Sequence, residues 1–411
     1  MKYQDLKITF SVTHFFLFAF FILLATVPPD LTIEGKNYLL IFVSILGMLI
    51  LSAVSYRSFP AKMETRLAII LIYITFSFFV NFENSQVLSF VYSLFFILSY
   101  SFYSSFMEKR LTRENYRYLL RTVFIIFFIG LVAGQLFLYL DIFIPLVRTG
   151  GSVHAMMGIL LEPTGYRLYS VSSEPSYAAF IVIILFYSYV TVGLKRNTIL
   201  KGENALFFPM LLYMILIFKS AYGIILIAAL IVGQFGFSRK AILVYSLVPL
   251  VILPLILMDF KFEAMERVIK IVEELDTSNL HTLANIDFTA YYRLAPFLHY
   301  FESSSLMDPC FYIGHGAGAS KLFIVPEIYL AYPNGEFAGG FLPAFLYDYG
   351  IFGALLVMGF IFQKIGFISI PSLVAVLMLL NANFNTQLFW FIILCLTLNQ
   401  HFKREENEAF H

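Results

Sequence analysis

Long apolar runs alternate with short polar turns along most of this chain. A helix needs about 20 apolar residues to cross the hydrocarbon core of a bilayer. On that criterion the pattern predicts an all-α integral membrane protein with about 12 transmembrane helices, forming a single polytopic domain over residues 1–411. The predicted spans are residues 10–27, 38–55, 67–82, 87–106, 122–140, 177–193, 205–218, 222–237, 241–258, 341–360, 365–380 and 387–400.

Two polar segments are much longer than the other turns. The first covers residues 141–176, after the fifth predicted span, and the second covers residues 259–340, after the ninth. A transporter more often binds its substrate near the middle of the membrane. Two large loops on one side of the membrane instead favour chemistry at the membrane surface.

The seventh and eighth predicted spans are separated only by Lys219, Ser220 and Ala221. If they formed one continuous helix, every later segment would change sides. Cytoplasmic segments of membrane proteins carry an excess of Lys and Arg, which distinguishes the two topologies. With separate spans and a cytoplasmic N-terminus, the cytoplasmic segments hold all but nine of the 27 Lys and Arg residues. Those nine are Lys36, Arg148, Arg167, Lys219, Lys261, Arg267, Lys270, Arg293 and Lys321.

One continuous helix would instead move Lys364 and the basic pair at 403–404 to the outside. The topology with separate spans therefore fits the distribution of basic residues better. We expect both termini in the cytoplasm and both long loops in the periplasm.

The composition agrees with a lipid environment. Hydrophobic residues make up 60% of the chain and charged residues 13%, whereas about 25% charged residues is typical of soluble domains. The formal net charge of +1 argues against nucleic acid as a partner. The two cysteines, Cys310 and Cys395, form no spacing typical of a metal site. We therefore expect the lipid bilayer as a partner, and neither a metal nor nucleic acid.

Basic side chains in the long loops are the first candidates for substrate binding. Arg148 and Arg167 lie in the first loop and Arg293 lies in the second. A guanidinium group binds phosphate oxygens through paired hydrogen bonds, and a lipid-linked diphosphate presents its phosphates at the depth of the headgroups. Lys219, at the break between two spans, could contact a phosphate in the same way. Each of these side chains could instead only extend toward the headgroups or pair with a carboxylate.

A carboxylate precedes the sixth predicted span in the stretch Ser-Glu-Pro-Ser at 173–176. Pro175 suits the first turn of a helix, and the helix dipole stabilises the anionic form of Glu174. An anionic carboxylate can accept a proton from a substrate hydroxyl. A helix start with a charge-matching Glu explains both residues equally well, but it does not explain Arg167 in the same loop.

A glycine-rich segment in the second loop reads Gly-His-Gly-Ala-Gly over residues 314–318. Gly314 and Gly316 would let the backbone approach a ligand closely. No β-α-β pattern surrounds the segment, so it is not a dinucleotide-binding fingerprint. His315 could exchange a proton near neutral pH, although a histidine in such a turn is more often structural. Other loop histidines compete for the role of base: His154, His281 and His299.

The order of these motifs resembles the O-antigen polymerase (Wzy-type) family of bacterial envelope polysaccharide synthesis. The resemblance covers most of the chain and includes Lys-Ser at 219–220 and Tyr-Gly-Ile-Phe-Gly at 349–353. An Arg-x10-Gly spacing found in some members is absent after Arg293. The related O-antigen ligases often carry a His-Asn pair where this chain has Tyr-Pro-Asn at 332–334, a departure that disfavours a ligase. Asn334 is a further candidate for substrate binding.

The resemblance implies a GT-C-like helical fold in the bacterial inner membrane, with the active site facing the periplasm. Such an enzyme transfers a growing glycan from undecaprenyl diphosphate to a lipid-linked repeat unit, without a nucleotide sugar, a metal or another cofactor. Family members use outward loop arginines for the diphosphate or glycan, a role that the resemblance extends to Arg167 and Arg293. A chain-length regulator protein could be a further partner.

We therefore interpret the chain as a repeat-unit polymerase for O-antigen or capsule, with Glu174 slightly favoured over His315 as the base. Two alternatives stay open. An O-antigen ligase would transfer the glycan to the lipid A core, and a flippase or transporter would move it without reaction. The predicted spans are almost free of charged residues, which disfavours a proton-coupled carrier.

Overall fold

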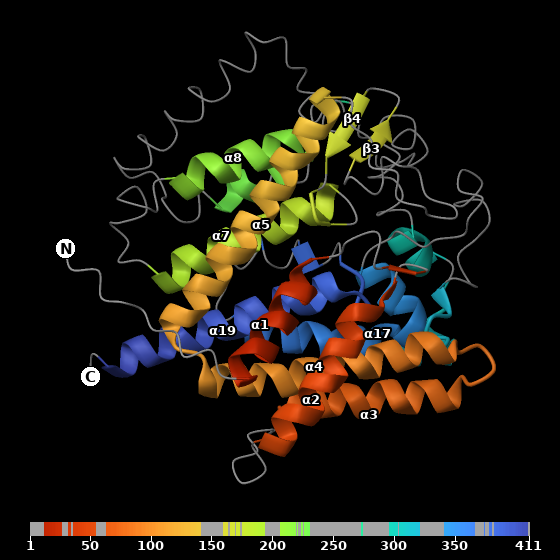
Figure 1. Ribbon diagram of the computed structural model, residues 1–411. Helices are drawn as coiled ribbons and strands as arrows, with labels where there is room; N and C mark the ends of the chain where they lie inside the picture. Colours follow the sequence, from red (N-terminus) through yellow and green to blue (C-terminus); the bar gives the residue numbers. More distant parts are fainter. Residues whose placement is uncertain are drawn as a thin grey trace.

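The computed structural model describes residues 12–26, 32–33, 36–54, 63–140, 159–162, 165–168, 170–172, 175–193, 206–218, 220, 223–224, 226–230, 273, 296–302, 304–320, 341–365, 374, 378–379 and 382–409. Most of these residues are helical (Figure 1). Three helical segments are long and apolar enough to cross a membrane, namely Val87–Arg110, Arg113–Leu136 and Phe341–Ile365. Together with shorter apolar helices they fit an all-α membrane protein.

Apart from a short helix at Pro309–Ile313 in the second long loop, the described helices listed here overlap the predicted apolar runs. The N-terminal half contains α1 (Val12–Ala25), α2 (Tyr38–Val54), α3 (Thr65–Val80), α4 (Val87–Arg110) and α5 (Arg113–Leu140). After them come α7 (Pro175–Gly193), α8 (Phe207–Ile217), α14 (Pro309–Ile313), α17 (Phe341–Ile365) and α19 (Gln387–Ala409). The predicted spans at 241–258 and most of 365–380 lie outside the described residues.

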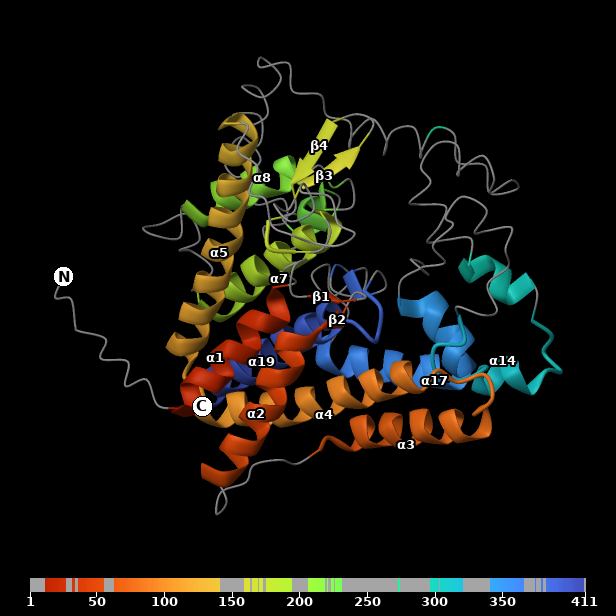
Figure 2. The ribbon, with the colours of Figure 1, turned by 45° about the vertical axis from the view of Figure 1, so that its right-hand side comes forward.

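Two short hairpins depart from the purely helical prediction. Strands β1 (Thr32–Ile33) and β2 (Lys36–Asn37) pair antiparallel just before α2. Strands β3 (Ile159–Glu162) and β4 (Gly165–Leu168) pair antiparallel within the first long loop. Both hairpins lie between helices, and β3 and β4 pack near α5 (Figure 2).

The break between the seventh and eighth predicted spans is real. Helix α8 ends at Ile217. The Ser220 side-chain oxygen then accepts the N–H of Gly223 over 3.1 Å, and its carbonyl accepts the N–H of Ile224 over 3.0 Å. These bonds are those of a residue that caps the start of a new helix. The helix is therefore interrupted at this point, and two separate membrane crossings remain a prediction.

Helix α19 forms the centre of the bundle and contacts α1, α4, α7 and α17. Its residues from Gln387 to Asn399 are all buried, as expected for a helix that is apolar on every face. Helices α3 and α4 run antiparallel beside each other below it, while α5, α7 and α8 form a second group on its other side (Figures 1 and 2). Helix α17 packs between α3 and α19 and is kinked at Gly350.

Candidate functional site

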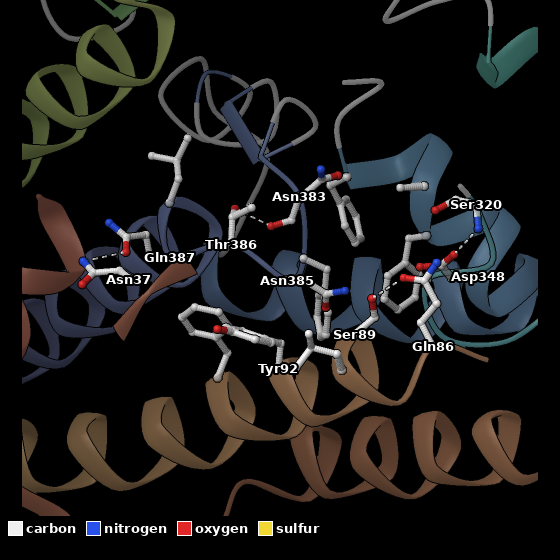
Figure 3. A pocket seen from close by; sticks show the side chains of 18 of the residues that line it. Asn37, Gln86, Ser89, Tyr92, Ser320, Asp348, Asn383, Asn385, Thr386 and Gln387 are labelled. Carbon is white, nitrogen blue, oxygen red and sulfur yellow. Dashed lines mark hydrogen bonds between the residues drawn. The ribbon is translucent and has the colours of Figure 1, made fainter. Parts of the chain in front are cut away.

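The N-terminal parts of α2, α4, α7, α17 and α19 surround a cavity of about 310 Å³ (Figure 3). This volume lies at the lower end of the range of small-molecule sites, about 300 to 1,000 Å³. The predicted topology assigns the start of each of these helices to the periplasmic side. The fold thus brings together, around one cavity, helix starts that are far apart in the sequence.

A pair of amide side chains lines one end of the cavity. Asn37 Nδ2 donates to Gln387 Oε1 over 3.3 Å, and Gln387 Nε2 donates to the carbonyl of Thr26 over 2.9 Å. Asn37 Oδ1 accepts the N–H of Leu40 over 3.0 Å and so caps the start of α2. These bonds fix the orientation of both amides.

Hydroxyl and amide groups line the middle of the cavity. Ser93 Oγ donates to Asn385 Oδ1 over 2.6 Å, which joins α4 to the segment before α19. Thr386 Oγ1 donates to the carbonyl of Asn383 over 2.6 Å in the turn that leads into α19. Asn383 Oδ1 is buried and has no hydrogen-bond partner within the part of the chain that the structure describes. Aromatic rings form much of the remaining wall: Tyr92, Phe96, Tyr177, Phe341, Phe345, Tyr349 and Phe384.

A carboxylate lies at the other end of the cavity. Asp348 belongs to α17 and is only 5% exposed. Its Oδ1 accepts the N–H of Ser320 over 2.8 Å. Gln86 and Ser89 of the α4 start lie beside it in Figure 3, and Ser89 Oγ donates to Gln86 Oε1 over 3.4 Å.

The kink in α17 explains how the glycine-rich segment docks. Gly350 has φ 66° and ψ −173°, which interrupts the regular helical hydrogen bonds around it. The carbonyls just before the kink therefore need other donors. The N–H of His315 donates to the Tyr347 carbonyl and that of Gly316 to the Asp348 carbonyl, each over 2.9 Å. The glycine-rich segment thus completes the backbone hydrogen bonding of α17 beside Asp348.

Two further glycines fit the same segment against the corner between α3 and α4. A Cβ on Gly316 would lie 2.2 Å from Ser85 Oγ, and one on Gly318 would lie 2.5 Å from Ser89 Oγ. Both positions also have positive φ, 107° and 73°. The N–H of Gln86 donates to the Ala317 carbonyl over 2.7 Å. Close backbone approach is therefore what these glycines provide here, and their neighbours are protein atoms.

Two of the four candidate histidines, His299 and His315, are described by the structure, whereas His154 and His281 lie outside the described residues. Neither His315 nor His299 is among the residues described as lining the cavity. Burial lowers the pKa of His315, and the nearby Asp308 acts in the opposite direction. The backbone of His315, through its bond to the Tyr347 carbonyl, has the clearer structural role.

The remaining sequence candidates are placed only in part. Arg167 lies on β4, where it pairs with Leu160 of β3. Gly314 and Gly316 lie in the docked segment described above. Five candidates lie outside the described residues, so the structure neither joins them to the cavity nor separates them from it: Glu174, Arg148, Arg293, Lys219 and Asn334.

Asp348 is the residue that the sequence interpretation overlooked. It is the one Asp, Glu, Lys or Arg within all the predicted spans, in a chain whose apolar runs are otherwise free of these residue types. An ionisable residue inside a membrane span is by default a candidate functional residue. That signal was present in the sequence, two residues before Gly350.

Comparison with known proteins adds no relative: no protein-family model matches this chain, and no curated protein is significantly similar to it. The functional interpretation therefore rests on the site itself.

Proposed function

We propose that this chain is a membrane glycosyltransferase that polymerises polysaccharide repeat units. It would transfer a growing glycan from undecaprenyl diphosphate to the terminal sugar of a second lipid-linked repeat unit. The observation that carries the proposal is the lining of the cavity. Sugar hydroxyls both donate and accept hydrogen bonds, as amide and hydroxyl side chains do. The apolar faces of sugar rings pack on aromatic side chains, and the cavity offers both kinds of surface.

The buried amide oxygen of Asn383 supports a polar ligand in particular. Buried polar atoms in proteins are hydrogen-bonded in the great majority of cases. Asn383 Oδ1 lacks a partner among the described residues and belongs to a residue that lines the cavity. A hydroxyl group of a bound sugar would supply the missing donor.

The diphosphate of the donor requires positive charge, because the leaving group becomes more negative as the glycosidic bond breaks. The described lining of the cavity contains no Lys or Arg. We therefore assign this role to the loop residues Arg167 and Arg293, with Arg148 and Lys219 as further candidates. In this proposal the glycan occupies the cavity, and the diphosphate lies at its rim on the periplasmic side of the inner membrane.

Glycan analysis of a strain lacking the chain tests the proposal. A polymerase defect leaves single repeat units attached to lipid A, which run as one short band on a gel. Loss of a ligase would leave no glycan on lipid A, and loss of a flippase would leave lipid-linked repeat units on the cytoplasmic side. Either of these results would contradict the proposal, and a chain-length regulator would change only the length distribution.

A further inference from the structure

We infer that Asp348 is the catalytic residue that accepts the proton of the attacking sugar hydroxyl. The inference rests on the proposed function, because it assigns a role within that reaction. It also identifies the end of the cavity near Asp348, Gln86 and Ser89 as the place where the acceptor sugar binds.

The Asp348 carboxylate lies in surroundings where acidic groups are rare. Asp348 lines the cavity and is nearly buried, with 5% exposure. It lies in a helix that is apolar enough to cross a membrane. A carboxylate in such surroundings is destabilising unless it is well hydrogen-bonded, and it is found mainly at functional sites. Packing alone does not explain an acidic residue here, because the rest of α17 supplies apolar side chains to the core.

Hydrogen bonds hold the Asp348 carboxylate in a fixed position. Its Oδ1 accepts the Ser320 N–H over 2.8 Å, while its own carbonyl accepts the Gly316 N–H over 2.9 Å. The next residue, Tyr349, directly precedes the kink, and its carbonyl accepts the Tyr73 hydroxyl over 2.8 Å. Backbone and side chain are thus both held, as a catalytic group requires for a productive geometry. The bond to Ser320 therefore orients the carboxylate group.

Polar side chains that can bind a sugar lie beside Asp348. Gln86 and Ser89 lie next to Asp348, and their side chains are joined by a 3.4 Å hydrogen bond (Figure 3). An amide and a hydroxyl beside a carboxylate form a set of groups that can hold a sugar by two hydroxyls while the third group receives a proton. The two described histidines that were candidates for a base, His299 and His315, are not among the residues that line the cavity.

The acceptor hydroxyl oxygen forms a bond to the anomeric carbon of the donor glycan. The bond from that carbon to the phosphate oxygen breaks, and its electron pair leaves with undecaprenyl diphosphate. The hydroxyl proton passes to the Asp348 carboxylate, which later releases it to the departing diphosphate or to water. No oxidant, reductant or further reactant is required.

The alternative role is structural: Asp348 would then serve only as a hydrogen-bond acceptor for its protein neighbours, the Ser320 N–H among them. Asp348→Asn distinguishes the two roles, since an amide oxygen still accepts that bond but is a far weaker base. Asp308→Asn is a matched control, because Asp308 Oδ1 also accepts a backbone N–H, that of Cys310 over 2.9 Å, and does not line the cavity. Both variants therefore lose one charge and keep one backbone bond.

The experiment uses the purified full chain in lipid nanodiscs, supplied with lipid-linked repeat units extracted from a strain that lacks it. Glycan length is followed on gels between pH 6 and 9. General base catalysis contributes about 10²–10⁴-fold to a rate, so Asp348→Asn should lower polymerisation by about that factor while Asp308→Asn leaves it unchanged. The residual rate of Asp348→Asn should rise with pH, because hydroxide then replaces the lost base.

The outcomes separate the inference from the proposed function. If the unaltered chain polymerises and Asp348→Asn stays within about tenfold of it, well below the effect of a general base, the inference is overturned and the polymerase function stands. If the unaltered chain makes no polymer from this substrate, the proposed function fails and the inference fails with it.

A second measurement does not depend on the folding of a variant. Dicyclohexylcarbodiimide modifies carboxyl groups in apolar surroundings, and mass spectrometry locates the adduct. We expect modification of Asp348 in the unaltered chain to match the loss of polymerisation, and added lipid-linked repeat units to slow both. Full activity of chains modified at Asp348 would contradict the assignment.

Discussion

Gly314 and Gly350 occupy complementary positions in two backbones that touch. A Cβ on Gly314 would lie 2.4 Å from the Asp348 carbonyl oxygen, and one on Gly350 would lie 2.4 Å from the Tyr312 carbonyl. Both residues combine positive φ, 77° and 66°, with an extended ψ of −175° and −173°. This backbone region is accessible essentially only to glycine. The second long loop is thereby joined to the kink in α17, immediately beside Asp348.

Replacing either glycine should therefore destabilise the protein. Gly314→Ala and Gly350→Ala each place a methyl group against backbone and add strain of about 1–3 kcal/mol from the dihedral angles alone. We expect earlier thermal unfolding in detergent and less folded protein in the membrane fraction. Because Gly314 packs against the Asp348 backbone and Gly350 is two residues from Asp348, polymer formation should fall more steeply than the amount of protein.

The matched control is Gly359→Ala, farther along the same helix. Among the described residues, a Cβ there would have no atom within 4 Å apart from those of its own helix, and the Arg66 side chain donates to the Gly359 backbone carbonyl, which the substitution keeps. Alanine is favoured over glycine in a helix by about 1 kcal/mol, so this variant should be at least as stable as the unaltered chain. Equal stability of the Gly350→Ala and Gly359→Ala variants would contradict the close docking.

The lowered pKa of His315 makes a further prediction about pH. Burial favours the neutral imidazole in the folded state, so the folded chain binds fewer protons than the unfolded chain below pH about 6.5. The contribution of neutral His315 to the free energy of unfolding is fully present above pH about 6.5. It is lost as the pH falls through the lowered pKa of His315 in the folded chain. We expect acid to shift thermal unfolding of the unaltered chain more than that of His315→Gln. A parallel decline of both proteins between pH 7.5 and 5 would show that His315 titrates normally.

Helix positions could be predicted from the sequence because the length of an apolar run is a local property. Helix α4 shows the limit of this criterion. The helix continues to Arg110, past the predicted end at 106. Its last turn carries Lys109 and Arg110, which interact favourably with the C-terminal end of the helix dipole. Such extensions contain polar residues and so fall outside an apolar-run criterion.

The site could be predicted only in part, because it depends on contacts between distant segments. The glycine-rich segment at 314–318 was expected to let its backbone approach a ligand closely, whereas the close neighbours that the structure shows are protein atoms. Its neighbours are Asp348 and Ser89 because α17 and α4 pack against it. A local sequence pattern cannot predict this packing. The convergence of Asn37, Gln387 and Asn383 on one cavity is likewise a tertiary property.

Asn385→Ala should weaken acceptor binding with little effect on the maximal rate. Asn385 lines the cavity and accepts a hydrogen bond from Ser93. Loss of one typical hydrogen bond changes a binding free energy by about 0.5–1.5 kcal/mol. The concentration of lipid-linked repeat unit at half-maximal polymerisation should therefore rise by about two- to tenfold. Asn115→Ala, in the first turn of α5 away from the cavity, is the control. Unchanged half-maximal concentrations in Asn385→Ala would argue against acceptor binding at this position.

Arg167→Ala and Arg293→Ala should each abolish polymer while leaving the amount of protein normal. The reason is the proposed contact with the diphosphate, whose planar paired hydrogen bonds require a guanidinium group. Lysine at either position should restore polymer only partly, because it lacks that geometry. Arg66→Ala, on the predicted cytoplasmic side, should behave like the unaltered chain. Normal polymer in both loop variants would remove the arginines from the proposed site.

The final prediction concerns the sidedness of the membrane, which decides whether the cavity can face a periplasmic substrate. Met307 in the second loop is 93% exposed, and Glu114 in the first turn of α5 is also exposed. The predicted topology places them on opposite sides of the bilayer, because basic residues concentrate in the segments assigned to the cytoplasm.

Met307→Cys and Glu114→Cys, each built in a chain whose Cys310 and Cys395 are replaced by serine, provide single labelling positions. An impermeant maleimide should label Met307→Cys in intact cells, after removal of the outer membrane barrier, and Glu114→Cys only after the inner membrane is opened. Labelling of Glu114→Cys but not Met307→Cys in intact cells would place the helix starts around the cavity in the cytoplasm, where a periplasmic glycan could not reach Asp348.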